Sequence, residues 1–419
     1  MRFLRLIFWY CAAFAAPFVP LRATAQEGLR TSLAGDAATE ARRQSAESMP
    51  YTIKEGDLRV LFSPSIGLEW NDNISISQGK PQQDFIIEPS LQMRTIYPLS
   101  QQNLLDLNVG FGYQKYLEHP KLDTWNLQSG TAVNFDMSIK DFWINFHDRV
   151  SYTQDPAQEP TLVGTADYAT INNSVGLEVN WDLNALILTA GYDHNNTIST
   201  SKQFSSQDSA TDSFHGRAGF HVNSGLTTGI EITGAFTSYD QMVLNNNSSY
   251  SFGVYADWQP GKYFHVQPRA GFTMSQFQKT SSTIQTSGQN SWYADLNISH
   301  EVSDAISYAL DAGHEIKLGI QSDAVEDSYV RPNVTLNIIR NVGLSAFFSY
   351  EHGQQGVGNI TGNLQETYDW MGTGFSMNYQ PMKKLSVALN YRLTVRTSSS
   401  TARDYQQNTV GLTLTYQMQ

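Results

Sequence analysis

The chain has 419 residues, 40% of them hydrophobic and 16% charged, and its formal net charge is −12 at pH 7. This charge and the lack of any block of lysine or arginine argue against nucleic-acid binding, because phosphates would be repelled. The only cysteine, Cys11, lies in the first 25 residues, so disulfides, thiolate metal sites and cysteine nucleophiles are excluded from the rest of the chain, and no cofactor is expected.

The first 25 residues are predicted to be an export signal. Arg2 and Arg5 supply positive charge, an apolar run covers residues 6–19, and residues 23–25 are small enough for cleavage after Ala25. A membrane-anchoring helix needs about 20 uninterrupted apolar residues, and prolines break this run too early. Residues 26–57 are polar and poor in large apolar side chains, which predicts a flexible periplasmic segment.

From residue 58 onward, the chain repeats runs of alternating apolar and polar residues. Residues 105–113 and 385–396 place large apolar side chains on one set of alternate positions and polar or small ones on the other. A strand would separate these sets onto two faces, whereas a helix would mix them. We count about 18 such runs, with 16 to 18 as the range, each roughly ten residues long, which suits a tilted strand that crosses a bilayer.

The connections between these runs alternate in length. Tight turns are expected near Ser100, residues 140–141, Asn184, residues 224–225, 260–261 and 303–304, Asn341 and residues 382–383. Longer polar segments lie between them, for example residues 71–83, 155–167, 195–212, 280–289 and 353–365. Short periplasmic turns and long external loops are typical of outer-membrane barrels, whose even strand number returns both chain ends to the periplasm.

The fold class is therefore predicted to be all-β: a transmembrane antiparallel up-and-down β-barrel over residues 58–419 in the bacterial outer membrane. The alternative is a soluble β-sandwich, in which the apolar faces would meet inside. The strand length, the alternating loops and the export signal favour the barrel, as do aromatic residues on the apolar register near run ends, which resemble interfacial girdles. The assignment is weakest where Asp148 and Thr373 fall on the apolar face.

Both ends of the predicted barrel carry recognisable motifs. The first strand runs through Trp70 into Asn71-Asp72-Asn73-Ile74, which resembles the family described as putative β-barrel porin type 2 and its exopolysaccharide-locus relatives. The resemblance implies an outer-membrane barrel that serves solute passage or polysaccharide export. The last strand, with its apolar alternation from Leu412 to Met418, resembles the recognition signal of the barrel-assembly machinery, although it ends in Met-Gln rather than on an aromatic residue.

The polar register of the predicted strands should face the lumen. A barrel of this size leaves an aqueous channel unless something fills it. Mixed charges would create a transverse field for polar solutes, with a slight acidic excess that favours cations; alternatively, the charges simply pair and stiffen the wall. The candidate pore-lining residues are Arg59, Glu69, Glu88, Arg94, Asp106, Arg149, Glu178, Arg217, Glu231, Asp257, Arg269, Asp295, Asp311, Glu315, Lys317, Arg331, Glu351, Arg392 and Arg396.

These features favour a porin whose water-filled channel passes small polar solutes or saccharides. One alternative is a barrel component of an exopolysaccharide export or surface-assembly system, and a second is an outer-membrane hydrolase. No enzymatic activity is expected, because no Ser-His-acid spacing stands out and the histidines are scattered. The expected partners are outer-membrane lipid, the assembly machinery and the solute or polysaccharide, without nucleic acid. The sequence does not determine the oligomeric state.

Overall fold

A computed structural model describes residues 48–100, 102–128, 130–279, 288–320, 322–357 and 366–419. The first strands are β1 (Ile53–Glu55), β2 (Leu58–Asn71), β3 (Asp84–Pro98), β4 (Asn103–Tyr116), β5 (Thr124–Leu127), β6 (Thr131–Ile139), β7 (Phe142–Thr153), β8 (Thr170–Asp182), β9 (Leu186–Ser199) and β10 (Ser209–Asn223). They are followed by β11 (Leu226–Tyr239), β12 (Asn247–Gly261), β13 (Phe264–Phe277), β14 (Gln289–Ser303), β15 (Ile306–Lys317), β16 (Ala324–Ile339), β17 (Val342–Val357), β18 (Glu366–Met382), β19 (Leu385–Ser398) and β20 (Tyr405–Tyr416). Short 3₁₀ helices occur at η3 (Pro120–Leu122), η4 (Pro156–Gln158) and η5 (Lys202–Gln207), and among the described residues no helix is long and apolar enough to cross a bilayer.

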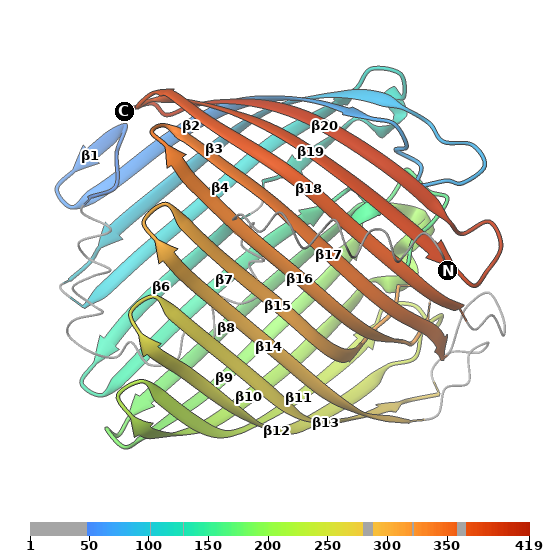
Figure 1. The fold of residues 1–419 in the computed structure, drawn as a ribbon. Coiled ribbons are helices and arrows are strands. Elements are labelled where there is room, and N and C mark those ends of the chain that lie inside the picture. Colours follow the sequence, from blue (N-terminus) through green and yellow to red (C-terminus); the bar gives the residue numbers. More distant parts are fainter. Residues whose placement is uncertain (1–47, 101, 129, 280–287, 321, 358–365) are drawn as a thin grey trace.

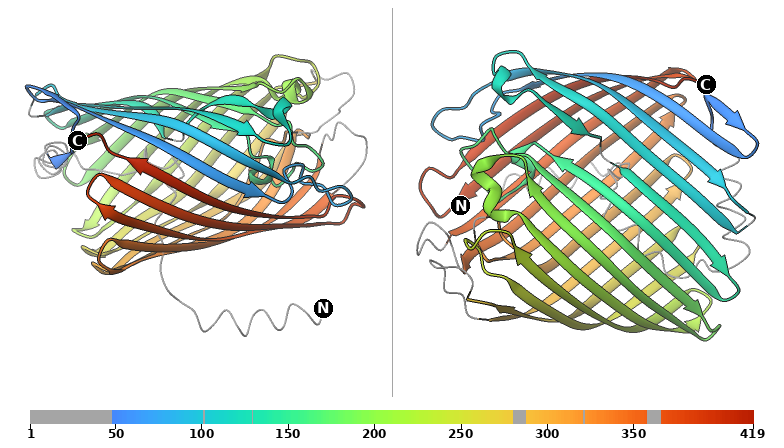
Figure 2. Two further views of the ribbon diagram at one scale, coloured as in Figure 1. Left: turned by 90° about the horizontal axis from the view of Figure 1, so that it is seen from above. Right: turned by 180° about the vertical axis from the view of Figure 1, so that it is seen from behind.

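The strands form one closed antiparallel barrel. Each strand pairs with its neighbour in the chain, and β2 pairs with both β3 and β20, which closes the sheet. β5 and β6 both pair with β4 and together make one interrupted strand, so the barrel has 18 strands. Front and back walls are inclined in opposite directions (Figures 1 and 2). The predicted fold class and strand count are confirmed.

Short turns and long connections alternate as predicted. At three of the short turns, Lys140, Asn184 and Asn341 adopt positive φ angles of 53°, 65° and 65°. Such left-handed residues match the twist of two strands joined by a tight hairpin, and asparagine tolerates them well. The C-terminus lies at the end with the short turns (Figure 1).

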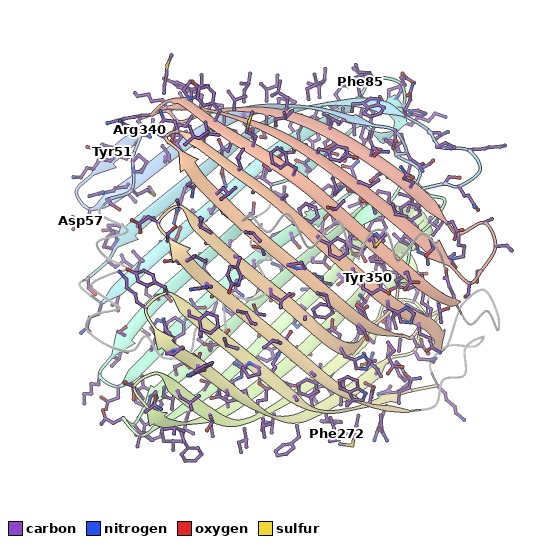
Figure 3. The ribbon with its side chains drawn as sticks, in the orientation of Figure 1. Tyr51, Asp57, Phe85, Phe272, Arg340 and Tyr350 are labelled. Carbon is purple, nitrogen blue, oxygen red and sulfur yellow. The ribbon has the colours of Figure 1, made fainter. Side chains whose placement is uncertain are left out.

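The two faces of the sheet differ as the alternation predicts. Phe85 and Phe272 point away from the barrel (Figure 3), and Phe272 is 71% exposed. Most strands are 12 to 17 residues long, longer than the predicted ten. Because about ten residues suffice to cross the hydrocarbon layer, the remainder extends the wall beyond the membrane and carries the polar connections.

The described part of the predicted N-terminal segment contains a short strand that the sequence pattern does not reveal. β1 pairs with the start of β2, with Lys54 opposite Arg59. Met49 packs against Leu61 and Ile96 at this end of the barrel. Residues 1–47, which include the predicted export signal, lie outside the described residues, and the domain boundaries at residues 25 and 57 stay predictions.

Candidate channel interior

Every candidate pore-lining residue lies on the face of the sheet opposite the exposed apolar side chains. The pairing register gives this directly: Arg269 pairs with Asp295, Asp311 with Arg331, and Arg217 is opposite both Thr189 and Glu231. Because side chains two residues apart on a strand share a face, the other candidates fall on the same inner face. Most of them, however, do not gather into one site.

Three carboxylates on the inner wall share one arrangement, in which each binds at least one cation and accepts a hydrogen bond from a tyrosine hydroxyl. The contacts are Glu231 with Arg217 (2.8 Å) and Tyr293 (2.8 Å), Asp295 with Arg269 (3.1 Å) and Tyr329 (2.9 Å), and Glu351 with Lys317 (3.0 Å), Arg331 (3.5 Å) and Tyr368 (3.0 Å). We call these residues the inner-wall network. Charge-assisted hydrogen bonds of this kind fix the charged groups on the wall.

The tyrosines of the inner-wall network lie flat against the sheet because glycines leave room for their rings. A Cβ atom on Gly353 would stand 2.1 Å from the ring of Tyr368, and one on Gly253 would stand 2.0 Å from the hydroxyl of Tyr293. Real Cβ atoms never approach this closely, so only glycine fits there.

Guanidinium groups lie over several of these rings. Arg331 sits 4.2 Å from the ring centroid of Tyr329, and Arg396 sits 4.8 Å from that of Tyr368. Arg217 on β10 lies 5.0 Å from the ring centroid of Tyr255. Cation–π attraction therefore adds to the ion pairs in holding the arginine side chains.

The cations of the network are more exposed than the acids beneath them. Side-chain exposure is 34% for Arg269 against 8% for Asp295, and 43% for Arg331 against 3% for Glu351. Lys317 is 33% exposed, while its second partner, Asp327 at 2.7 Å, is fully covered. A solute that touches this wall meets these three cations, and on β15 it also meets the exposed Glu315 and the partly exposed Asp311.

The opposite wall is less basic. On β7 to β10, His147 bonds Asp193 at 2.7 Å, and His215 lies 3.4 Å from Glu178. On β3, Glu88 accepts hydrogen bonds from side-chain amides, including that of Gln128 at 2.6 Å. The wall chemistry is therefore asymmetric: three exposed cations lie on β13 to β17, and a fourth, Arg94 on β3, is 50% exposed and pairs with Asp106.

Residues 154–169, which connect β7 to β8, fold back into the barrel and contact its inner wall. Asp155 forms an ion pair with Arg392 on β19. Arg396, which is fully buried, donates to the carbonyl of Pro160 at 2.6 Å and also binds Glu366 at 2.6 Å. Because β19 stands across the barrel from β7 and β8, this segment crosses the lumen; we call it the crossing loop.

An apolar cluster secures the crossing loop. Ala157, Leu162 and Tyr168 from the loop pack with Phe204 and Tyr405, and all five are buried. The hydrogen bond from Gly164 N–H to the carbonyl of residue 76 adds the β2–β3 connection to this assembly. Burial also raises the pKa of the Tyr168 hydroxyl. The external mouth is thereby narrowed by ordered polypeptide.

Glu159 brings an ionisable group from the crossing loop into the channel. Its half-buried carboxyl lies within the electrostatic field of Lys317 and Glu351. Burial raises the pKa of Glu159 from 4.5 to about 7, the negative Glu351 raises it further, and the positive Lys317 opposes both. The charge at the constriction therefore changes near neutral pH.

Sequence reasoning located the inner face but missed three features: the crossing loop, its Glu159, and the tyrosine partners of the wall carboxylates. The loop has the same polar composition as the external loops, so composition carried no signal for it. Across the described ranges, no cluster of three or more His, Cys, Asp or Glu side chains is arranged to hold a metal ion.

Comparisons with known proteins identify related chains. The model of the family described as "Putative beta-barrel porin 2" matches residues 53–418. A search of curated proteins finds no match.

Among solved structures, OccK5 (OpdH) of Pseudomonas aeruginosa is 11% identical, with 85% of this chain and 98% of that chain covered and a TM-score of 0.46. OccK2 (OpdF) of P. aeruginosa, solved in complex with glucuronate, is 10% identical, with 87% and 99% covered and a TM-score of 0.48. A BenF-like porin from Pseudomonas fluorescens Pf-5 is 9% identical, with 86% and 99% covered and a TM-score of 0.49.

Proposed function

Because the chain belongs to the "Putative beta-barrel porin 2" family, it is an outer-membrane β-barrel porin, and we propose that its channel passes small polar solutes with a preference for anions. The observation that carries the preference is the unequal exposure of the inner-wall ion pairs. Arg269, Arg331 and Lys317 face the lumen, whereas Asp295, Glu351 and Asp327 beneath them are covered; Asp311, the second partner of Arg331, is 26% exposed. Exposed donors on a charged pore wall attract solutes of opposite charge. This reverses the cation preference that residue counts alone favour.

The crossing loop favours small solutes over a polymer. A polysaccharide in transit needs an uninterrupted path, whereas here residues 154–169 bridge the lumen and bind the wall at Arg392 and Arg396. Small carboxylated or hydroxylated solutes suit the mixture of guanidinium, carboxylate and hydroxyl groups. We further propose that residues 1–25 direct export and that the last strand engages the assembly machinery.

Planar-bilayer recording tests the proposal. In a KCl gradient, purified folded barrels should open ion-sized steps with a reversal potential that indicates anion selectivity. Replacing Arg269 and Arg331 together with glutamine should lower the anion-to-cation permeability ratio several-fold, because two exposed cations of the inner-wall network are lost. Lys262→Gln, which removes a positive charge from the exposed β12–β13 turn, is the matched control and should leave the ratio unchanged.

Two results would contradict the proposal. Folded barrels that never open refute the channel itself. A cation-selective wild-type channel, or an unchanged ratio in the double variant, refutes the assigned wall.

A further inference from the structure

The outer wall of the barrel contains a serine, a histidine and a glutamate in sequential contact. Ser328 Oγ lies 2.8 Å from His314 Nδ1, and His314 Nε2 lies 3.2 Å from Glu326 Oε1. His314 on β15 is the cross-strand partner of Ser328 on β16. All three side chains occupy the register that faces away from the lumen. They are therefore separate from the inner-wall network.

The histidine of this triad is held and shielded. The indole of Trp292 stacks on its ring, with centroids 4.0 Å apart and an interplanar angle of 17°. The His314 side chain is only 13% exposed, while Glu326 is 46% exposed. Nε2 of His314 approaches Glu326 without forming a hydrogen bond, so the carboxylate acts on the ring through its charge, while the hydrogen bond at Nδ1 is the contact through which an imidazole activates a serine hydroxyl.

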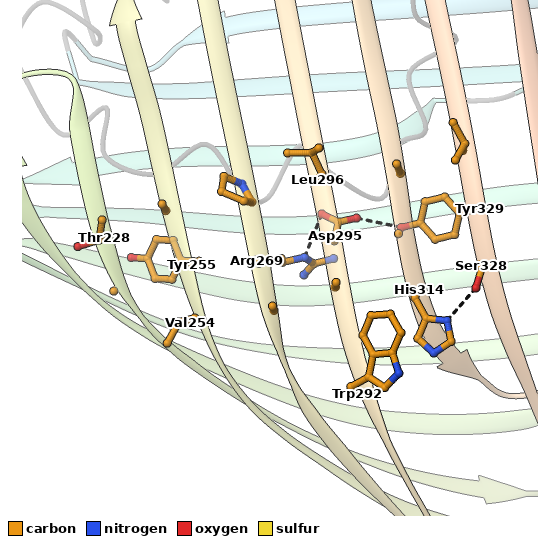
Figure 4. A pocket seen from close by; sticks show the side chains of 18 of the residues that line it. Thr228, Val254, Tyr255, Arg269, Trp292, Asp295, Leu296, His314, Ser328 and Tyr329 are labelled. Carbon is orange, nitrogen blue, oxygen red and sulfur yellow. Dashed lines mark hydrogen bonds and ion pairs between the residues drawn. The ribbon is translucent and has the colours of Figure 1, made fainter.

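The triad opens into a cavity on the same outer surface. This open depression has a volume of about 1080 Å³ and is lined by Trp292, Ala294, Leu296 and Ala312 besides His314 and Ser328 (Figure 4). Arg269, Asp295 and Tyr329 of the inner-wall network also belong to its lining. Its lining comes mostly from the lipid-facing register, which places it against the bilayer. This volume suits a ligand of lipid-chain size.

The triad also lies near the end of the barrel that carries the long connections. His314 is close to the end of β15, and Ser328 is close to the start of β16, next to the connection at the external side. Aromatic side chains such as Trp292 mark the membrane interface in barrels of this type. The apolar cavity continues from the triad across β14 toward β11 along the membrane-facing wall. An outer-leaflet lipid could place an acyl chain there and its ester at Ser328.

We propose that Ser328, His314 and Glu326 form a lipid-facing esterase site that hydrolyses the acyl ester of an outer-leaflet lipid. Ser328 Oγ attacks the ester carbonyl carbon while its proton passes to His314 Nδ1. The ester C–O bond then breaks, and the departing alcohol takes that proton. Water, deprotonated by His314, attacks the acyl-serine and releases the fatty acid, which regenerates the hydroxyl. Trp292 and the bond to Ser328 hold the ring, and Glu326 is a positioning residue whose negative charge stabilises the protonated form of the imidazole.

The activity can be measured on the full-length folded barrel in mixed vesicles of phospholipid that carry a fluorescent acyl ester. Wild-type protein should release labelled fatty acid, and a fluorophosphonate should label Ser328. Ser328→Ala and His314→Asn should each lower the rate at least about 1,000-fold. Glu326→Gln should lower kcat about 100-fold while KM stays near the wild-type value, because its carboxylate acts on the histidine and not on the lipid.

Two control variants make the same kinds of substitution at outward-facing residues outside the triad. His194→Asn changes another outward histidine, which bonds Asp212 at 2.8 Å, and Ser248→Ala changes an outward serine that pairs with Phe236. Both should keep the wild-type rate. Channel conductance should be the same in all these variants, so loss of folding or of the proposed transport is recognised separately. Folded wild-type barrels without fatty-acid release or labelling would overturn the esterase site, and so would release that persists in Ser328→Ala.

Discussion

At the residue scale, the ring of Tyr368 shows how the inner wall depends on glycine. Tyr368 is 1% exposed and lies on Gly353, where an added Cβ would stand 2.1 Å from the ring. Gly353→Ala should therefore displace the tyrosine and break its hydrogen bond to Glu351. We expect the free energy of unfolding in vesicles to fall by about 1–3 kcal/mol and the conductance to fall as the ring turns into the lumen.

Gly261→Ala is the control for this substitution, since nothing lies within 4 Å of an added Cβ there. Equal stability losses in the two variants would mean that the effect is general to glycine in strands rather than specific to the tyrosine. Urea titration of tryptophan fluorescence provides the measurement.

The sequence predicts which face of the sheet each side chain occupies, but it does not predict which side chains form hydrogen bonds or ion pairs with one another. Strict alternation places Arg217 and Glu231 on the inner face, because the side-chain period of a strand is two. Which acid an arginine meets depends on the register between strands, and pairs such as Tyr329 with Asp295 join residues that are two strands apart. The Ser328–His314 contact is likewise a cross-strand pair, invisible as a motif along the chain.

At the scale of elements, the crossing loop sets the width of the channel. Arg392 and Arg396 hold it through Asp155 and the carbonyl of Pro160. Replacing both arginines with methionine should release the loop, and single-channel conductance should rise at least about two-fold, because pore width limits ion flow. Lys383→Met, in the exposed turn before the same strand, should leave conductance unchanged. An unchanged conductance in the double variant would show that the narrowest part of the channel lies elsewhere.

The same loop should make selectivity depend on pH. The pKa of Glu159, raised to about 7 by burial, means that the carboxyl is neutral below that pH and negative above it. Its negative charge offsets Lys317, so anion preference should increase as the pH falls from about 8 to about 6. Glu159→Gln should hold the low-pH permeability ratio at both pH values. Reversal potentials measured at each pH give the permeability ratios. If the ratio of the variant changes with pH as much as that of the wild type, Glu159 is not the titrating group.

The sequence did not reveal that this loop folds inward. Its anchors are arginines on β19 and a cluster with Phe204 and Tyr405, all far away in the chain, whereas loop composition reports only local preference for turns and solvent. The strands were predictable because their periodicity is local and their length is fixed by the bilayer.

At the scale of the whole molecule, the pairing of β2 with β20 joins the two ends of the sheet and makes it a barrel. The pairing sets Gly67 opposite Thr413, and an added Cβ at Gly67 would meet only ordinary contacts at 3.7 Å. Cysteines placed at both positions should therefore form a disulfide on oxidation of the folded protein, which changes the migration of the denatured chain in a non-reducing gel. A pair at Gly67 and Thr233, on the opposite wall, should not cross-link, because disulfides need Cα atoms within about 7 Å. Cross-linking of the second pair but not of the first would require a different closure and, with it, a different lumen.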